Sequence, residues 1–165
     1  MATSATTTDW LYKKYMYYIL RGKAWTPTPQ VKIALYTTTP GSGIGDTGVE
    51  VIENDNTKYK RVTLPANDTT WSAATDGTME ISNLVEIVFP VPGTQSWGTI
   101  TGCGILASEY TSAGTGGGDP GNSGDKVDVL MWVGRIATPK SVQSGDGAPR
   151  ILVGQLKITR ASCGN

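Results

Sequence analysis

The alternation of apolar and polar positions predicts a chain built mainly of β-strands. In residues 31–39, VKIALYTTT, the apolar Val31, Ile33 and Leu35 fall on every second position, which is the period of a half-buried strand. Strands are predicted over six further segments, at residues 59–64, 79–82, 85–91, 98–106, 127–136 and 151–159. Short strands separated by turn residues favour a mainly β fold, an antiparallel β-sandwich or barrel of about six to eight strands.

One segment near the start has the period of a helix instead. Thr6 and Asp9 have the spacing of a helix N-terminus, and the apolar residues of WLYKKYMYYIL follow near i, i+3, i+4 spacing until a glycine. The sequence therefore predicts an N-terminal tail over residues 1–8, one amphipathic helix over 9–22 and a β domain over 30–160.

The aromatic residues of this helix suit either a core or an interface. The rings of Trp10, Tyr15 and Tyr18 can be buried while their polar tips stay in water. The helix therefore either packs on the core of its own domain or docks on a partner. We take these three residues as part of a candidate interface.

Residues 112–125, SAGTGGGDPGNSGD, contain no apolar side chain larger than alanine or proline. Such a composition neither packs nor holds one conformation, so we expect a flexible surface loop. Asp119, Asp125 and Asp128 lie in or beside it and carry the oxygen ligands that calcium prefers. Their spacing fits no EF-hand, and we predict no metal site.

The composition excludes several kinds of chemistry. The chain has no histidine, which is the commonest general base near neutral pH and the commonest metal ligand. Glu80 with Glu86, or Glu50 with Glu53, could be offered as a glycosidase pair, but proximity in sequence says little about the distance that such a pair needs. Glu80 and Glu86 are more typical of solvent-facing charges on a strand. The glycine-rich turn at 41–48 lacks the spacing of a nucleotide-binding loop. We predict no enzyme activity, no catalytic residues and no cofactor.

Charge and hydropathy limit the partners. Lys plus Arg and Asp plus Glu number 14 each, so the formal net charge is zero, and nothing attracts the chain to nucleic acid or to an anionic membrane. No apolar run approaches the ~18 residues that a membrane span needs, and the start resembles no secretory leader. Cys103 and Cys163 either pair or remain thiols.

Three tryptophans offer an alternative role in carbohydrate binding. Trp71, Trp97 and Trp132 would stack on sugars if they were exposed together. Each lies in or next to a predicted strand, where a large ring more often fills a core or an interface. Both roles stay open.

The stretch IATPKSVQSGD, residues 136–146, places Lys140 near Asp146. A catalytic lysine needs burial that lowers its pKa, and these residues are too polar for that. Pro139 favours an extended conformation before it, and SGDG tolerates turn geometry. We therefore expect the exit of a strand, a link and a turn, with Lys140 in solvent or in contact with a neighbouring subunit.

Four blocks follow one another along the chain: VKIALYTTTPGS (31–42), NTKYKRVTL (56–64), EIVFPVPGTQSWGTITGCGILAS (86–108) and VLMWVGRIATPKSVQSGD (129–146), followed by ILVGQLKIT. With the helix they span most of residues 10–160, and in series they resemble a family of short tailed-bacteriophage virion proteins often labelled tail fibre proteins. The resemblance implies a non-enzymatic, β-rich structural protein of the phage particle, with no catalytic residues to assign.

The family label leaves the role within the particle open. A fibre gains its length from coiled coils or repeats, and this chain shows neither. Its size favours a capsid decoration or cement protein, and the alternative is a small tail fibre or tail-tip protein, which includes a carbohydrate-binding receptor module with a host-surface glycan as ligand.

Both roles imply the same location and the same kinds of partner. The chain would be made in the host cytoplasm and assembled into the virion. There it would contact copies of itself, as a trimer or ring, and either the major capsid protein or tail proteins.

Overall fold

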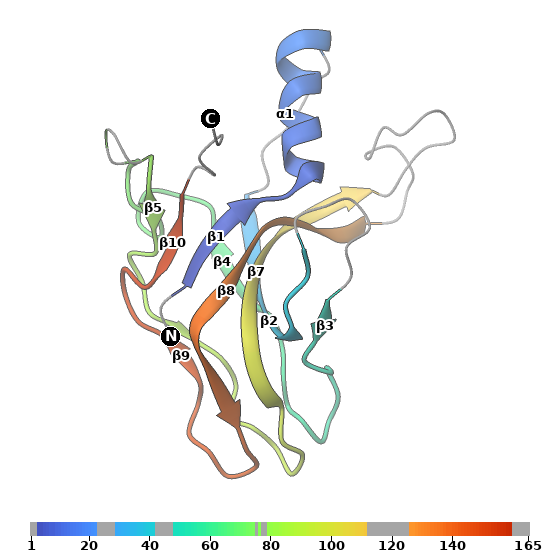
Figure 1. Ribbon diagram of the computed structural model, residues 1–165, viewed down its shortest axis with the longest axis vertical. Helices are drawn as coiled ribbons and strands as arrows, with labels where there is room; N and C mark the ends of the chain where they lie inside the picture. Colours follow the sequence, from blue (N-terminus) through green and yellow to red (C-terminus); the bar gives the residue numbers. More distant parts are fainter. Residues whose placement is uncertain are drawn as a thin grey trace.

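The computed structural model describes residues 3–22, 29–41, 48–74, 76, 79–111 and 126–159. Within them the chain forms β1 (Thr3–Thr7), α1 (Asp9–Arg21), β2 (Gln30–Thr38), β3 (Val49–Glu50), β4 (Val62–Pro65), β5 (Ile81–Ser82), β6 (Ile87–Val88), β7 (Gly98–Thr111), β8 (Lys126–Val142), β9 (Arg150–Ile151) and β10 (Leu156–Ile158) (Figure 1). The mainly β fold with one helix near the N-terminus is confirmed. The described strands number ten, because several are two-residue pieces that the sequence pattern does not separate. The predicted glycine-rich loop over 112–125 lies outside the described residues.

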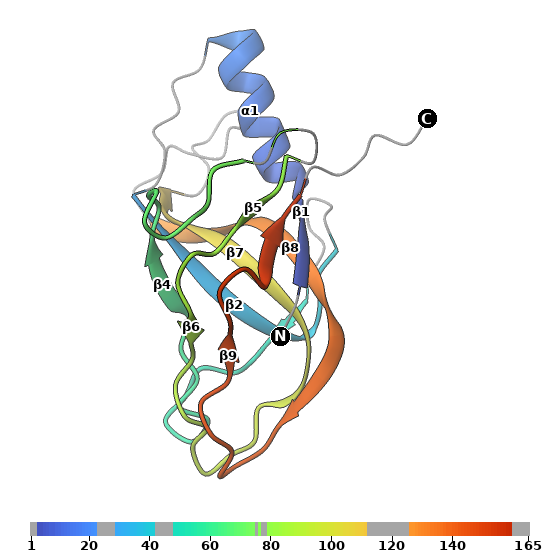
Figure 2. The ribbon, with the colours of Figure 1, turned by 90° about the vertical axis from the view of Figure 1, so that its left-hand side faces the viewer.

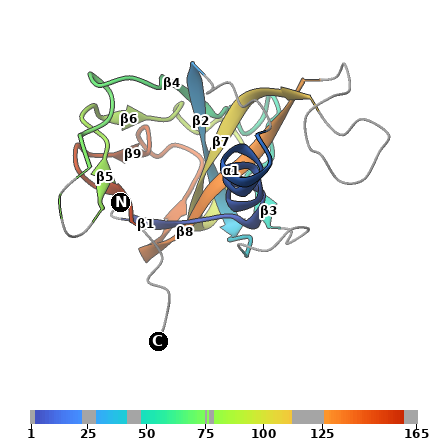
Figure 3. The same ribbon diagram turned by 90° about the horizontal axis from the view of Figure 1, so that it is seen from above.

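Eight strands form one sheet in the order β3-β2-β7-β8-β1-β10-β5, with β4 also paired to β2. All pairs are antiparallel except β1 with β10. A second sheet consists of β6 and β9 and lies off one face of β2 and β7 (Figures 2 and 3). The two unequal sheets enclose a shared core, so of the two predicted architectures the fold is closer to the sandwich.

The first strand corrects the expected N-terminal tail. Residues 1–8 carry no apolar alternation, yet Thr3–Thr7 form β1, which pairs with β8 on one side and β10 on the other. The register joins Thr7 to Trp132 and Thr3 to Leu156. Backbone hydrogen bonds to both neighbours hold this segment, and such bonds do not require apolar side chains.

The strand β2 is buried on both of its faces. Val31, Ile33 and Leu35 point into the main core, as the alternation predicts. On the opposite face Ala34 and Tyr36 are also buried, in a small cluster with Leu106 and the half-buried Leu130. The sequence pattern predicted a half-buried strand, but this small cluster buries the second face of β2 as well.

The main core lies between the large sheet and the segments that cover it. Its fully buried side chains come from both layers: Ile33, Leu35, Tyr59, Ile87, Phe89, Ile100, Ile105, Val142, Ile151 and Leu156. Three aromatic rings fill the part under β6. Tyr59 stacks on Phe89 with ring centroids 6.4 Å apart, and Trp97 meets Tyr59 edge-on at 5.2 Å.

The stretch at 136–146 forms the end of β8 and a turn, as predicted. The pairing of β8 with β7 passes from Arg135↔Gly102 to Lys140↔Ile100, so β8 bulges between Arg135 and Lys140. Pro139 falls within this bulge, where the missing N–H costs no ladder hydrogen bond. The strand ends at Val142, and the turn after it lies at the end of the molecule opposite α1 (Figure 1).

The predicted strand over 151–159 is split into β9 and β10 by a turn at Leu152–Gln155. Asn83, which is fully buried, holds this turn. Its Nδ2 donates to the carbonyl oxygens of Val85 and Leu152 at 2.8 and 3.0 Å, and its Oδ1 accepts from the N–H of Leu156 at 2.9 Å. One side chain therefore binds both ends of this turn and links it to the segment that follows β5.

Asn83→Ala should lower the free energy of unfolding by about 2–4 kcal/mol, because it leaves three backbone groups without their partner in a buried site. Urea unfolding followed by tryptophan fluorescence measures the change. Asn56→Ala, at an exposed position, is the control and should change stability by less than about 0.5 kcal/mol. Equal stability of Asn83→Ala and the wild type would contradict the structural role.

Candidate interface

The helix α1 is fixed to the sheet at its N-terminus. The N–H and hydroxyl of Thr8 donate to the carbonyl oxygens of Met131 and Leu130 in β8, each at 2.8 Å. The same hydroxyl accepts from the N–H of Leu11 at 3.5 Å and so caps the helix. At the other end Gly22 takes the left-handed conformation, with φ 59°, that commonly terminates helices. The helix predicted over 9–22 is thus confirmed, and it starts from a defined point on β8.

Within the described part of the chain, the first turn of α1 is the part of the helix that packs against the core. Leu11 is buried in the main core, and the half-buried Trp10 packs against it. Beyond this turn α1 projects away from the sheet (Figures 1 and 2), and from above it is seen nearly along its axis beside β7 and β8 (Figure 3). The helix is therefore anchored at one end and exposed along most of its length.

The exposed part of α1 carries a broad apolar surface. Five side chains are between 51 and 69% exposed, and we call them the α1 apolar face: Tyr12, Tyr15, Tyr18, Ile19 and Leu20. At about 100° per residue they span roughly 200° of the helix circumference. A helix of this length is marginally stable in water on its own, and most helices in proteins gain stability by burying their apolar face. This face is the candidate interface that the structure supports best.

Three cations lie on the other side of α1, over aromatic rings. Lys13 Nζ lies 5.5 Å from the ring centroid of Tyr17, and the Arg21 guanidinium lies 4.6 Å from the same ring. Lys14 Nζ lies 5.9 Å from the ring centroid of Trp10. These cation–π contacts hold the charges on the side of α1 that faces away from the apolar face.

The structure brings together two of the four candidate interface residues. Tyr15 and Tyr18 share the α1 apolar face. Trp10 lies on the opposite side of the helix and packs on the core, whereas Lys140 lies in β8. Tyr12, Ile19 and Leu20 were not among the predicted interface residues. The i, i+3, i+7 spacing of Tyr12, Tyr15 and Ile19 was the signal that could have identified this face.

Lys140 borders a separate, open hollow of about 600 Å³. The hollow is lined by Lys140, Ser141, Val142 and the segment 146–150. In this hollow the Asp146 carboxylate accepts from the N–H of Gln143 at 2.7 Å, which closes the turn after β8. Lys140 is exposed, which fits both predicted environments, solvent and contact with a neighbouring subunit.

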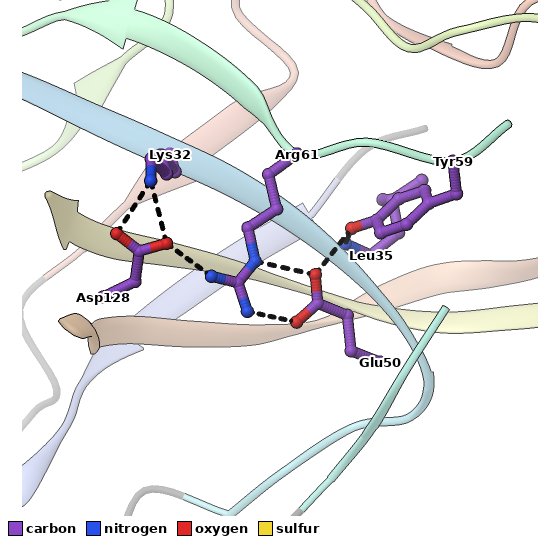
Figure 4. Close-up of polar contacts among 6 residues, drawn as sticks. All are labelled: Lys32, Leu35, Glu50, Tyr59, Arg61 and Asp128. Atoms are coloured by element: carbon purple, nitrogen blue, oxygen red, sulfur yellow. Dashed lines mark hydrogen bonds and ion pairs between the residues drawn. The ribbon is translucent and has the colours of Figure 1, made fainter. Parts of the chain in front are cut away.

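A polar network covers the face of β2 opposite the main core (Figure 4). Arg61 is its centre: Nε and Nη2 donate to the two carboxylate oxygens of Glu50 at 2.8 and 2.6 Å, and Nη1 donates to Asp128 at 2.5 Å. Lys32 Nζ donates to both oxygens of Asp128 at 2.9 and 3.0 Å. Two cations and two carboxylates thus link β2, β3 and β8 with the residue before β4.

Tyr59 extends this network into the backbone. Its hydroxyl donates to Glu50 at 3.0 Å and accepts from the N–H of Leu35 at 2.9 Å. The carbonyl oxygen of Leu35 accepts from the N–H of Val51 at 3.0 Å. Leu35 lies where the edge partner of β2 changes from β4 to β3, so Tyr59 satisfies a buried N–H that no strand pairs.

The pKa values agree with a structural role for this network. Burial raises the pKa of Tyr36 to about 12, with the nearby Glu50 carboxylate adding to the effect. Burial likewise raises the pKa of Tyr59 far above its ordinary value. The Glu50 hydrogen bond raises the pKa of Arg61 further above its usual range. The tyrosines stay protonated and Arg61 stays charged near neutral pH, which suits fixed hydrogen bonds.

Four of the carboxylates considered for catalysis or calcium binding form ion pairs, and Glu53 is exposed. Glu50 and Asp128 belong to the network around Arg61. Glu80 pairs with Lys157 at 2.9 Å and Glu86 with Arg150 at 3.3 Å, both near the surface. Asp119, Asp125 and the glycine-rich residues 42–47 lie outside the described residues.

The tryptophans do not form one exposed platform. Trp97 is 4% exposed, and its Nε1 donates to the carbonyl oxygen of Thr57 at 2.7 Å inside the core. Trp71 and Trp132 are half-buried and pack against the core. The predicted core role is right for Trp97, and the sugar-stacking alternative is wrong for this residue.

Cys103 is a buried free thiol whose pKa is raised to about 12 by burial. Cys163 lies outside the described residues. Among the described residues no group of three or more Cys, Asp or Glu side chains is placed to hold a metal ion. In the same part of the chain, no helix combines the length and the apolar character that crossing a membrane requires.

Fold and interface together define a mainly β structural domain with an exposed amphipathic helix at one end. The family model described as Podophage GP4 fiber I protein gp80 matches residues 6–159, and the chain belongs to this family of short-tailed phage fibre proteins. A search of curated proteins found no match. The resemblance seen in the sequence is confirmed, and the chain is a structural component of the virion, assembled in the host. Proteins of this kind are typically non-enzymatic.

Arg61→Met should lower the free energy of unfolding by about 2 kcal/mol, because two partly buried carboxylates lose hydrogen bonds and charge compensation. Arg150→Met is the matched control: its ion pair with Glu86 is more exposed, and its loss should cost less than about 0.5 kcal/mol. Chemical unfolding of both variants gives the comparison. Equal losses would show that the Arg61 network adds nothing beyond an ordinary surface ion pair.

Stability should fall as the pH rises from about 10 to about 12, the range between the ordinary and the folded pKa of Tyr36. In this range the unfolded chain releases the tyrosine proton while the folded chain keeps it, which costs about 2–3 kcal/mol for a shift of this size. Tyr36→Phe should therefore lose less stability than the wild type between pH 9.5 and 11.5, as measured by urea unfolding. Equal loss in both proteins would contradict the expected shift.

Proposed function

We propose that this chain is a small component of the tail fibre apparatus, attached to the particle by α1. The observation that carries the proposal is the family match, which extends over residues 6–159 and so includes both α1 and the β domain. A description as a fibre protein favours the tail over the capsid. The family description therefore supports a tail fibre or tail-tip role, which was the alternative drawn from the sequence. It gives less support to the capsid decoration role that the size of the chain favours.

The shape of the domain supports a polar arrangement on the particle. The α1 apolar face lies at one end, and the turn after β8 lies at the other (Figure 1). A domain held by α1 would direct that turn outward. Copies would occupy symmetry-equivalent positions around the tail, since virion positions repeat by symmetry.

Immunogold labelling of intact particles with antibodies against the purified chain tests this location. Label should be found at the tail, and particles from a phage that lacks the gene should remain unlabelled. Label spread in a regular array over the capsid would contradict the proposal and favour a decoration protein.

A further inference from the structure

The half of the domain away from α1 carries a second open hollow, of about 250 Å³, which we call the β3 hollow (Figure 1). It is lined by the end of β2, by β3 and the residues after it, and by residues 95–98, where β7 begins. We propose that the β3 hollow binds one uncharged pyranose ring of an oligosaccharide. The inference rests on the proposed function, because a domain attached by α1 turns this half outward.

Three segments meet at the end of the domain opposite α1 (Figures 1 and 2), and they are residues 52–58, 91–97 and 142–148. Backbone hydrogen bonds join them. The N–H of Gln95 donates to the carbonyl oxygen of Asn56 at 3.0 Å, and the N–H of Trp97 donates to that of Val142, also at 3.0 Å. Binding residues often lie on loops that a rigid scaffold positions, and a fixed site loses less entropy on binding. The β3 hollow therefore has an ordered support.

Part of the lining of the β3 hollow is apolar. Val49 and Ile52 are 56 and 62% exposed, and the buried Val51 lies between them in sequence. Trp97 also lines the hollow, but at 4% exposure it offers no face for stacking and supports the lining from below. One face of a pyranose ring consists mainly of C–H groups. Placed on Val49 and Ile52, this face would remove apolar area from water.

Three neutral polar side chains, Thr37, Gln95 and Ser96, complete the lining. Among the described contacts, the side-chain amide of Gln95 has no partner. The Ser96 hydroxyl donates to Gln143 Oε1 at 3.0 Å and accepts from the N–H of Ser144 at 3.1 Å. The Thr37 hydroxyl donates to a carbonyl oxygen of β3 at 3.0 Å. Both hydroxyls keep a further acceptor position, and sugar hydroxyls can donate to them and to the amide oxygen.

The charge of the lining favours an uncharged ligand. Among the described residues that line the β3 hollow, Glu50 alone has a charged side chain. Its two oxygens accept from Arg61 at 2.8 and 2.6 Å, and one of them also accepts from the Tyr59 hydroxyl (Figure 4). A charged ligand would lose hydration here without gaining a counter-charge. A hydrocarbon would leave the polar groups of Gln95 without water or a partner. A hydroxyl-bearing ring avoids both costs.

The size of the β3 hollow limits what it can hold. Its volume of about 250 Å³ lies just below the ~300 Å³ at which sites for drug-sized ligands begin. This space suits one ring and not an extended chain. A contact of this size is weak in one copy, but copies at symmetry-equivalent positions would bind repeating units of one polysaccharide together and gain from avidity.

The test uses the purified full chain and oligosaccharides released from the surface polysaccharide of the bacterium that the phage infects. Titration followed by NMR should shift the amide resonances of residues that line the β3 hollow. Binding should change by less than about twofold between about 50 and 500 mM NaCl, because no charge on the ligand is neutralised.

Two variants and their controls test the site. Gln95→Ala should weaken binding by about fivefold, because its amide loses the sugar hydroxyls. Gln30→Ala, at the exposed start of β2, should bind within about twofold of the wild type. Ile52→Ser should also weaken binding by about fivefold, and Leu152→Ser, which is 47% exposed between β9 and β10, should leave it unchanged. Circular dichroism confirms that each variant is folded.

Three results would overturn the inference. Absence of binding to any released oligosaccharide at millimolar concentration would exclude a sugar ligand. Wild-type binding by both Gln95→Ala and Ile52→Ser would exclude the β3 hollow as the site. Binding that weakens as salt rises would indicate an anionic ligand, which the lining of the β3 hollow does not complement. Gold label on the capsid would instead count against the proposed function, and it would leave the binding measured with purified chain unchanged.

Discussion

The fold depends on how the backbone of β2 is satisfied where its edge partner changes. Between the segments that pair with β4 and β3, the N–H of Leu35 has only the Tyr59 hydroxyl as its partner among the described contacts. A buried N–H without a partner would cost free energy comparable to that of a lost hydrogen bond. Tyr59 meets this need from the core side, with its ring between Phe89 and Trp97. Its hydroxyl also joins Glu50, and through Glu50 the Arg61 network that reaches β8. One side chain thus connects the two layers of the domain.

The same sheet supports the candidate interface. β8 pairs with β7 and β1, and it offers two carbonyl oxygens to Thr8, where α1 begins. The direction in which α1 leaves the domain is therefore set by the middle of the sheet and not by a flexible tether. A fibre protein that has to present a helix in a constant orientation gains from this arrangement, because the helix is already ordered before a partner binds.

Local patterns predicted the elements better than their limits. The helix over 9–22 and the strand over 31–39 follow from periodicity and caps, which depend on neighbouring residues, and the structure places α1 at Asp9–Arg21 and β2 at Gln30–Thr38. The strand over Thr3–Thr7 was missed because its backbone is held by β8 and β10, far away in sequence. The single strand expected over 151–159 is divided because the side chain of Asn83, about 70 positions earlier, forms hydrogen bonds with the backbone of Leu152 and Leu156. Neither long-range contact can be recognised from the local pattern of apolar and polar residues.

For function, the sequence by itself determined the mainly β class, the amphipathic helix and the resemblance to phage fibre proteins, because each is recorded in the order and spacing of residues. Only the tertiary structure decided which aromatic residues are exposed. Trp10 and Tyr15 lie five positions apart on one helix, yet one packs on the core and the other lies in solvent, because β8 anchors α1 by its first turn. The charge pairs of Arg61 were likewise invisible in the sequence, since Asp128 lies 67 positions away and only the pairing of distant strands brings the two together.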